Sequence, residues 1–433
     1  MTLRGFTRGR GEPVAAPRVG LFGLLGSGNI GNDASLEAVL AYLRDAHPDA
    51  IVDAMAMGPE VLREKYAIMA IPLLWCRKYE NRVPGGLSMA IKVLGKSVDA
   101  FRTASWVRRH DVVIVPGMGV LEASLPLRPW GFPYAMFLLC ASGRLFGTKV
   151  ALVSVGANRI NQRATRWLFN SAARFAFYRS YRDNQSREAM RQRGLDISGD
   201  RVYPDLVFAI PEPPSAPGDP QIVGVGVMMY QGTNDDRQQA HEIHAAYLQT
   251  LKGFVRWLVD GGRKVRLLVG DTYDHGVVQE ILADQREHRP DLGSAWVVAE
   301  PVSSFAELTR AIAPVGTVVA TRYHNVICAL KLGKPTISLG YAQKNLELMA
   351  NVGMSEFCQS ANSLDLDLLI QQFTELERRS VQLSQTIGER NAANARSLED
   401  QFALLSSVLF PAGEAAPDRA GRQPLNKSSR RWP

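Results

Sequence analysis

Short apolar runs alternate with amphipathic helical patterns along most of this chain, and this alternation limits the possible folds more than any other feature. In the first half the runs are Val19–Leu25, Ile51–Met55, Asp111–Val115 and Lys149–Val155, and two of the helical patterns are Tyr134–Arg144 and Thr165–Phe175. Strands that are apolar on both sides are typical of parallel sheets, whose crossover helices cover both faces. The pattern therefore predicts an α/β fold with a mostly parallel sheet.

The second half repeats this scheme after a proline-rich segment, Pro211–Pro220, which cannot continue a helix or a central strand. A chain of 433 residues also exceeds the usual size of one hydrophobic core. We therefore predict two doubly wound, Rossmann-like domains, residues 18–212 and 221–360, that face each other across a cleft. The long helical pattern in residues 361–410 is expected to pack back across the joint between them.

The net charge of +8 is concentrated at the two ends of the chain. Residues 1–18 hold four arginines and one glutamate, and residues 411–433 hold five basic and two acidic residues. We expect disordered basic tails at residues 1–17 and 411–433, which argues against a dedicated nucleic-acid groove but leaves contact with anionic lipid headgroups open. A second basic group lies among apolar residues at 87–110: Lys92, Lys96, Arg102, Arg108 and Arg109. This segment favours a solvated helix face, with a membrane-surface helix as the alternative.

The four cysteines, Cys76, Cys140, Cys328 and Cys358, are far apart and lack histidines at metal-ligand spacing. They are typical of reduced thiols in a cytosolic protein. No signal-peptide pattern follows the N-terminal arginines, and the most apolar stretch, Phe132–Gly143, is too short to span a bilayer. We therefore expect a soluble, cytoplasmic protein, with the inner face of the membrane as an alternative location.

The segment Val318–Asn345 carries the strongest chemical signal. Arg322 and His324 stand where an apolar strand gives way to an amphipathic helix, and Lys344 follows the next strand. In α/β sheets anions collect at the carboxyl ends of strands, where the following helix presents free N–H groups. Arginine offers a two-pronged contact for carboxylate or phosphate, and histidine exchanges protons near neutral pH. These residues predict an anion site with an acid–base group; an ion pair and a hydrogen bond within the protein are the structural alternative.

A glycine-rich loop, Gly26–Gly31, matches G-x-G-x-x-G directly after a strand and before a helix, which suggests a dinucleotide fold. Two features weaken that reading: Asp53 lies inside the following strand rather than at its end, and the loop is unusually polar. Such a loop lets the backbone approach a phosphate or a sugar closely, although a turn needed only for folding is the alternative. The candidate substrate contacts in and after the loop are Gly28, Asn29, Gly31 and Asp33.

Three further features carry weaker signals. Small residues end two strands and leave room for a ligand there: Gly117, Gly119 and Gly156. Arg182 precedes Asp183, a helix-start residue, and is a second candidate anion contact. The sequence GDTYDH could imitate a metal site through Asp271, Asp274 and His275, but a polar loop explains it as well, so we expect no metal site.

Several of these segments together resemble the polysaccharide pyruvyl transferase family over residues 18–360: GSGNIGND, the glycine-ended central strand, YRDNQS, Pro204-Asp205-Leu206 and TRYHNVICALKLGKPTISLGYAQKN. The most specific part is T-R-x-H, followed by an apolar helix, G-x-P and Tyr341-x-x-Lys344. The chain departs from the commoner N-x-G-D loop, because it reads Gly31-Asn32-Asp33, and it has Gly117-Met118-Gly119 where G-G is frequent.

The resemblance implies a fold of the glycosyltransferase-B type, with the acceptor on the N-terminal domain and the donor on the C-terminal one. It implies transfer of the pyruvyl group of phosphoenolpyruvate to two hydroxyls of a sugar as a cyclic ketal, with release of phosphate and without a cofactor. His324 would protonate the methylene carbon, Arg322 and Arg182 would hold the carboxylate and phosphate, and Lys344 would bind substrate. The partner would be a glycan, free or linked to a lipid or a nucleotide.

Two alternatives stay open at this point. A nucleotide-sugar glycosyltransferase of the same architecture would use Arg322 and Lys344 to hold a diphosphate, and His324 as a base or orienting group. A catalytically silent carbohydrate-binding protein would bind glycans without turning over either donor. Phosphate release from phosphoenolpyruvate, against nucleotide release from a sugar donor, separates the two enzymes.

Overall fold

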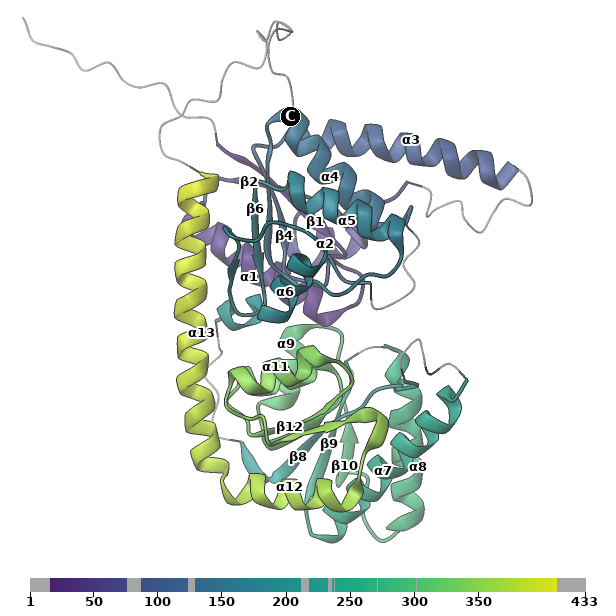
Figure 1. Cartoon of the computed structure of the whole chain (residues 1–433). Coiled ribbons are helices and arrows are strands. Elements are labelled where there is room, and N and C mark those ends of the chain that lie inside the picture. The colour runs from purple at the N-terminus through teal and green to yellow at the C-terminus, as the bar shows by residue number, and fades with distance from the viewer. Residues whose placement is uncertain are drawn as a thin grey trace, which may run out of the picture.

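The computed structural model describes residues 16–75, 87–123, 129–211, 218–232, 236, 238–270, 272–300 and 302–410, and all of their side chains except those of residues 87–93. These residues form two α/β domains, and a long C-terminal helix runs along one side of both (Figure 1). Of the predicted tails, residues 1–15 and 411–433 lie outside the described part of the chain. Among the described helices, none has both the length and the apolar composition needed to cross a bilayer.

The first domain is built on a seven-stranded sheet with the order β3-β2-β1-β4-β5-β6-β7, and all neighbouring strands in it are parallel. Its strands are β1 (Arg18–Gly23), β2 (Ile51–Ala56), β3 (Met69–Pro72), β4 (Val112–Pro116), β5 (Lys149–Val155), β6 (Tyr178–Tyr181) and β7 (Arg201–Val202). The strand order reverses between β1 and β4. In such sheets ligands bind beyond the carboxyl ends of the strands at this reversal.

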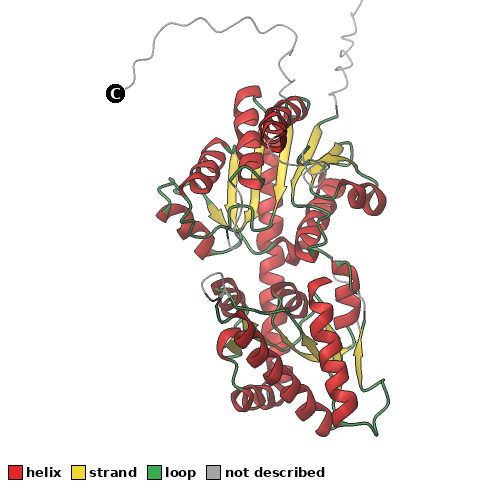
Figure 2. Ribbon diagram, turned by 90° about the vertical axis from the view of Figure 1, so that its right-hand side faces the viewer, coloured by secondary structure: helices red, strands yellow, loops and turns green. Residues whose placement is uncertain are grey.

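Helices cover both faces of the sheet, as the sequence pattern predicts (Figure 2). They are α1 (Ile30–Ala46), α2 (Pro59–Tyr66), α3 (Leu87–Val107), α4 (Phe132–Phe146), α5 (Arg163–Phe175) and α6 (Asn184–Gln192), followed by the short η2 (Leu206–Ala209). The two central strands β4 and β5 are buried along almost their whole length. Their continuous apolar sequences therefore follow from cover on both faces rather than one.

The second domain repeats this plan with a six-stranded parallel sheet in the order β10-β9-β8-β11-β12-β13. Its strands are β8 (Asp219–Gly226), β9 (Lys264–Leu268), β10 (Val297–Ala299), β11 (Val315–Ala320), β12 (Thr336–Gly340) and β13 (Cys358–Ser360). Its helices are α7 (Ala240–Asp260), α8 (His275–His288), α9 (Phe305–Ile312), α10 (Tyr323–Lys331) and α11 (Gln343–Asn351), with short turns at η4 (Thr272–Asp274) and η5 (Ala361–Ser363).

The last two helices, α12 (Leu366–Arg378) and α13 (Ser380–Leu409), connect the second domain back to the first (Figure 1). In the first half of α13, the Asn391 amide donates to the carbonyl oxygens of Leu330 and Lys331 in the second domain. Towards its end the buried Gln401 accepts from the Ser154 hydroxyl and donates to that of Ser180 in the first domain. One helix thus contacts both domains through hydrogen bonds, and those to the first domain are buried and costly to break.

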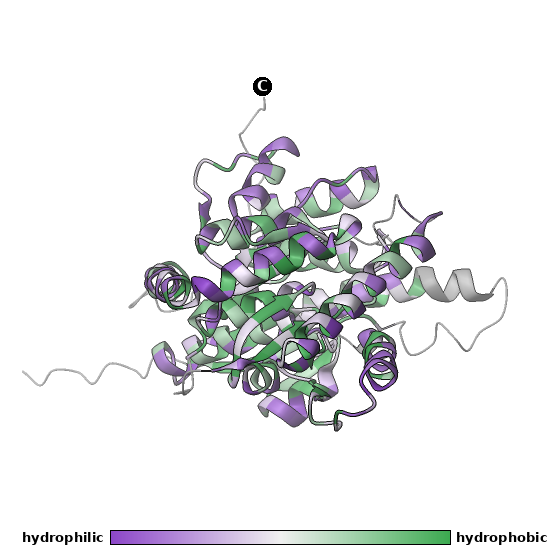
Figure 3. Ribbon diagram, turned by 90° about the horizontal axis from the view of Figure 1, so that it is seen from below, coloured by the Kyte–Doolittle hydropathy of each residue, from purple (hydrophilic) through white to green (hydrophobic). Residues whose placement is uncertain are grey.

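Packing follows the amphipathic spacing of the helices. Seen from below, hydrophobic residues gather on the central strands and hydrophilic residues on the outer helices (Figure 3). In α5, for example, Leu168 and Phe169 are buried, while Arg163 and Arg166 are exposed. The described cysteines, Cys140, Cys328 and Cys358, are free thiols, and Cys76 lies outside the described residues.

The predicted α/β class with two doubly wound sheets is confirmed. Several short elements were not predicted because they offer too few residues for a clear apolar period: α2, β3, β7, α11 and β13. One boundary matters for the site. The helix after Arg322 begins at Tyr323. Arg322 is therefore at the N-cap position, and His324 lies in the first turn of the helix.

Candidate active site between the domains

Arg322 is held by a buried carboxylate of its own domain. It follows β11 and is the N-cap residue of α10. Its Nε and Nη2 atoms donate to the two oxygens of Asp274 at 2.9 and 2.6 Å. Asp274 is fully buried and also accepts from the backbone N–H of Met229 at 2.9 Å. This two-pronged ion pair fixes the orientation of the guanidinium. The Arg322 side chain is 19% exposed.

His324 reaches across the joint to the glycine-rich loop of the first domain. A Cβ atom placed on Gly31 would lie within 2.7 Å of three atoms of the His324 imidazole, Nε2 among them. Real Cβ atoms do not approach other atoms so closely, so only glycine fits at position 31 in this arrangement. Gly31 lies in the first turn of α1. The imidazole is therefore placed at the N-terminal end of a helix, which disfavours a positive charge.

Three cations surround His324, one from the first domain and two from the second. Burial, followed by the charges of Lys344, Arg182 and Arg322, lowers the pKa of His324 to about 3. The imidazole is consequently neutral at neutral pH in the protein without ligand. Arg322 and Arg182 each pair with a carboxylate of the protein. The gathering of three cationic side chains around one histidine is typical of an anion-binding site.

Arg182 enters from β6 of the first domain and is almost completely buried. It pairs with Glu122, and its guanidinium nitrogens lie 3.6 Å from Asp183 and 3.8 Å from Asp205. Burial alone would raise the pKa of Glu122, but Arg182 and Lys344 lower it below its ordinary value. The Glu122 carboxylate is therefore ionised between these two cations. Asp183 is also the N-cap of α6, because its side chain accepts from the N–H of Ser186.

Tyr323 joins the two halves of the site. Its ring centroid lies 5.5 Å from the Arg182 guanidinium and 5.3 Å from the Lys344 ammonium, so both cations are in cation–π range. Lys344, in the first turn of α11, also lies 5.9 Å from the ring of Tyr341. Burial raises the pKa of the Tyr323 phenol well above its usual range, so it stays protonated. The Tyr323 ring is thus in contact range of one cation from each domain.

The polar residues of the glycine-rich loop are occupied by the loop itself. The Asn29 side chain caps α1 by accepting from the N–H groups of Gly31 and Asn32. Asp33 is buried, accepts from the N–H of Gly26 at 2.9 Å, and its pKa is raised by burial. Gly28 has positive φ and open space at its Cβ position. The sequence predicts Asn29 and Asp33 as substrate contacts. In the structure their hydrogen bonds shape the turn that brings Gly31 to His324.

The glycines at the strand ends make room for protein side chains as well. A Cβ on Gly117 would meet the Cβ of Ser35 at 2.8 Å, and one on Gly119 would meet the Glu122 carboxylate at 2.7 Å. A Cβ on Gly156 would meet the Arg182 guanidinium at 2.6 Å. The space that these glycines leave is filled by the Glu122–Arg182 pair and by α1, rather than left open as the sequence suggested.

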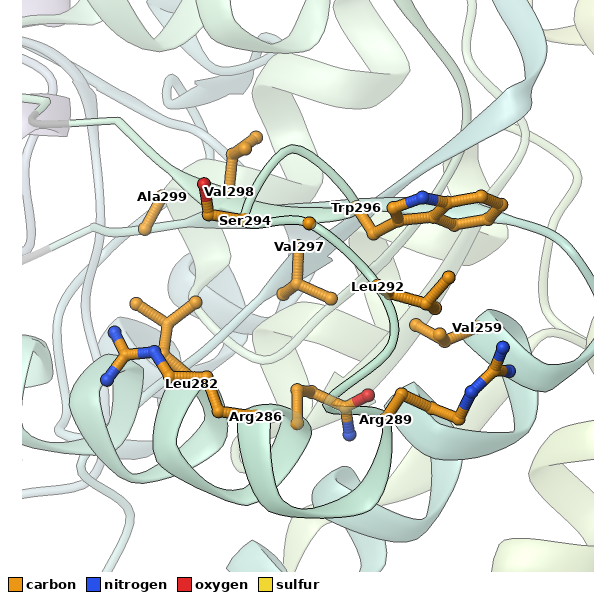
Figure 4. A pocket seen from close by; sticks show the side chains of 12 residues that line it. Val259, Leu282, Arg286, Arg289, Leu292, Ser294, Trp296, Val297, Val298 and Ala299 are labelled. Carbon is orange, nitrogen blue, oxygen red and sulfur yellow. The ribbon is translucent and has the colours of Figure 1, made fainter.

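The metal-like pattern, Asp53 and a pocket of the second domain add no ligand-binding group to this site. Asp274 is bonded to Arg322, Asp271 lies outside the described residues, and no cluster of metal-ligating side chains occurs in the described part. Asp53 accepts from the Trp106 indole and pairs with His110, so it does not face the glycine loop as a ribose ligand would. A pocket of about 510 Å³ lies in the second domain between α8 and β10, and none of its residues belongs to the site (Figure 4).

Sequence reasoning missed Glu122, Tyr323 and Asp274 as members of the site. Tyr323 stands between Arg322 and His324, but an aromatic residue at a helix start is more often part of a core. Glu122 is the first acidic residue after β4. Its position beyond the carboxyl end of a central strand is the sequence signal that could have marked it as a site residue. In the sequence, Asp274 stands out only as part of a metal-like pattern. Its role is to hold Arg322.

The neutral state of His324 predicts a stability effect in acid. An unfolded histidine takes up a proton below about pH 6.5, whereas folded His324 does not until about pH 3, so stability is lost as the pH falls between these values. From pH 7 to 5, the free energy of unfolding should fall by up to about 2 kcal/mol more in the natural protein than in His324→Gln. Urea unfolding at both pH values measures this, and His241→Gln, at an exposed histidine, is the control.

Comparison with known proteins agrees with this picture. A family model described as polysaccharide pyruvyl transferase matches residues 29–343. Among solved structures, a UDP-N-acetylglucosamine 2-epimerase aligns with a TM-score of 0.57 at 13% identity, covering 95% of this chain and 99% of that one. A putative enzyme of the same kind from Listeria monocytogenes gives 0.56 at 11% identity, with 93% and 99% covered.

A lipopolysaccharide outer core galactosyltransferase aligns with a TM-score of 0.52 at 10% identity, covering 90% of this chain and all of that one. No curated protein matches the sequence significantly. At such low identities the structural matches establish the fold alone, which is of the glycosyltransferase-B type. Because the family model spans well over half of the residues, including both halves of the site, the chain belongs to the polysaccharide pyruvyl transferase family.

Proposed function

We propose that this protein transfers the pyruvyl group of phosphoenolpyruvate to two hydroxyls of a sugar in a polysaccharide or its precursor, forming a cyclic ketal and releasing phosphate. The observation that carries the proposal is the cluster of Arg182, Arg322 and Lys344 around the neutral His324 at the joint of the domains. Phosphoenolpyruvate brings a phosphate and a carboxylate, which are the groups that arginine and lysine side chains bind. Membership of the family supports the same reaction class.

The cations have distinct geometries for the donor. Arg322 is oriented by Asp274, so the plane of its guanidinium is fixed, and a guanidinium matches the geometry of a carboxylate or phosphate. Lys344 can move with its flexible side chain and neutralise the phosphate as it leaves. Arg182 is held by Glu122, so it acts mainly as a fixed positive charge behind Tyr323.

The neutral imidazole suits a role as proton carrier. His324 takes the proton of the first sugar hydroxyl as that oxygen bonds to C2 of the donor, and gives it to C3, which becomes a methyl group. The second hydroxyl then replaces the phosphate at C2, and its proton leaves with the phosphate. Both hydroxyl protons are accounted for, one in the methyl group and one in hydrogen phosphate. Negative charge on the bound donor favours the transient imidazolium, since it offsets the three cations.

The direct test is to incubate the full chain with phosphoenolpyruvate and a panel of acceptor glycans, free, nucleotide-linked and lipid-linked. We expect phosphate release that depends on the acceptor, and a pyruvate ketal found by mass spectrometry. Nucleotide release from a sugar donor, with phosphoenolpyruvate untouched, would establish the glycosyltransferase alternative instead. Glycan binding by calorimetry without turnover of either donor would indicate a binding protein.

Changing Arg322 should separate shape from charge in donor binding. Arg322→Lys keeps the charge but loses the two-pronged geometry, so we expect phosphoenolpyruvate affinity to fall about tenfold or more. Arg322→Ala should lower the affinity for phosphoenolpyruvate further. It should also destabilise the domain, because the buried Asp274 loses its partner. Donor binding is measured by calorimetry and folding by circular dichroism. Unchanged affinity in both variants would remove Arg322 from the donor site.

The proposed reaction requires no metal ion, because its proton transfers and charge stabilisation are assigned to side chains. Full activity should therefore survive dialysis against EDTA. The measurement is initial-rate phosphate release before and after chelation, with each divalent metal then added back. Loss of activity that one particular metal restores would contradict this scheme.

A further inference from the structure

One face of the first domain is unusually rich in exposed hydrophobic side chains. The outer helical face is formed by α3, α4, α5 and their connecting turns, on the side of the domain away from α13 (Figure 1). Its exposed side chains are Leu94 (60%), Phe101 (76%), Trp130 (61%), Leu145 (74%), Trp167 (58%) and Phe175 (38%). Five of these six residues lie on the three helices and Trp130 lies in the turn before α4, and together they form more than the scattered apolar contacts that a soluble surface usually shows.

The same face carries positive charge almost without negative charge. The three helices contain a single carboxylate, Asp99, and that residue is only 2% exposed. Four exposed arginines lie on α4 and α5, and none forms an ion pair with another described residue: Arg144, Arg163, Arg166 and Arg174. Uncompensated charge on one face is costly to maintain unless it meets an anionic partner.

Aromatic and basic side chains are interleaved across this face. Lys96 lies 6.0 Å from the ring of Tyr134, and Arg108 lies 6.0 Å from that of Phe146. Rings beside amines and guanidinium groups are the arrangement found where proteins sit in the headgroup layer of membranes.

We propose that the outer helical face docks on an anionic lipid bilayer, with its aromatic and leucine side chains entering the headgroup boundary and its arginines contacting lipid phosphates. A second copy of the chain is a poor occupant, because a symmetric contact through this face would oppose like charges. Aliphatic side chains such as Leu94 and Leu145 offer nothing to a nucleic acid, but they gain free energy in lipid. A polysaccharide precursor carried on a lipid would be met at this surface.

The test is sedimentation of the full chain with vesicles made of equal parts phosphatidylglycerol and phosphatidylcholine, or of phosphatidylcholine alone. The charge variant is Arg144→Gln, Arg166→Gln, Arg174→Gln, and its matched control changes three exposed arginines elsewhere, Arg286, Arg310 and Arg390, to glutamine. The apolar variants are Leu145→Ser and Trp167→Ser, with Val381→Ser at an 84% exposed position as control. Circular dichroism checks that every variant folds.

We expect binding to the anionic vesicles only, weakened by raised salt. Each arginine near the surface contributes about 1 kcal/mol, so the charge variant should lower the partition coefficient on the order of a hundredfold, while its control keeps most of it. Both apolar variants should bind more weakly than Val381→Ser. Equal binding by all proteins would assign the effect to the basic tails and overturn the proposal. Binding of an oligonucleotide, but not of vesicles, through the same residues would overturn it as well.

Discussion

His324→Gln should lower kcat by at least about a hundredfold and leave the affinity for phosphoenolpyruvate nearly unchanged. Glutamine keeps a hydrogen-bonding group but cannot carry a proton from a hydroxyl to the methylene carbon. Donor affinity should survive because the imidazole is neutral in the resting protein, so its removal takes no charge from the anion site. The split between kcat and donor binding distinguishes a role in the transition state from a role in the ground state.

Phosphate release under saturating substrates measures kcat, and calorimetry with phosphoenolpyruvate alone measures donor affinity. His324→Ala should behave in the same way, which excludes an effect of the amide. His241→Gln, at an exposed position of α7, is the matched control and should be fully active. Turnover close to that of the natural protein in both His324 variants would leave the histidine as a structural residue and direct attention to Lys344.

Gly31→Ala should reduce kcat/KM by about a hundredfold even though it adds one methyl group. That methyl would lie within 2.7 Å of three imidazole atoms, so His324 or the first turn of α1 must move. A displacement of the order of an ångström at a reacting group is enough for such a loss. Stability should change little, because alanine favours the helix that begins here. Gly388→Ala, in α13 with no atom near its Cβ position, is the control.

A double variant gives this prediction its sharpest form. In the His324→Ala background the imidazole is gone, so Gly31→Ala should cost little further activity. Strong coupling between the two positions would establish that the glycine serves the histidine across the domain joint. Additive losses would show that Gly31 acts independently, for example by contacting the acceptor through its backbone.

Much of the site could be predicted because its residues follow strands. Arg322 and Lys344 each come just after a buried strand of the second sheet, and the ends of parallel strands in one sheet lie at one edge. Arg182 follows β6 of the first sheet. The histidine was noticed for its chemistry and its place beside Arg322. Which groups would partner them could not be predicted. Asp274 and Glu122 are distant from Arg322 and Arg182 in sequence, and nothing local in the chain pairs them.

The sequence by itself determined the fold class, the two-sheet plan and the membership of a family, since apolar periodicity and short motifs are local properties that survive without knowledge of contacts. Only the tertiary structure shows that Gly31 lies against His324. The two residues belong to different domains, and no local sequence pattern encodes how these domains pack together. The tertiary structure also decided the charge of the imidazole, because a pKa depends on burial and on cations brought from both domains, Arg182 from one and Lys344 from the other.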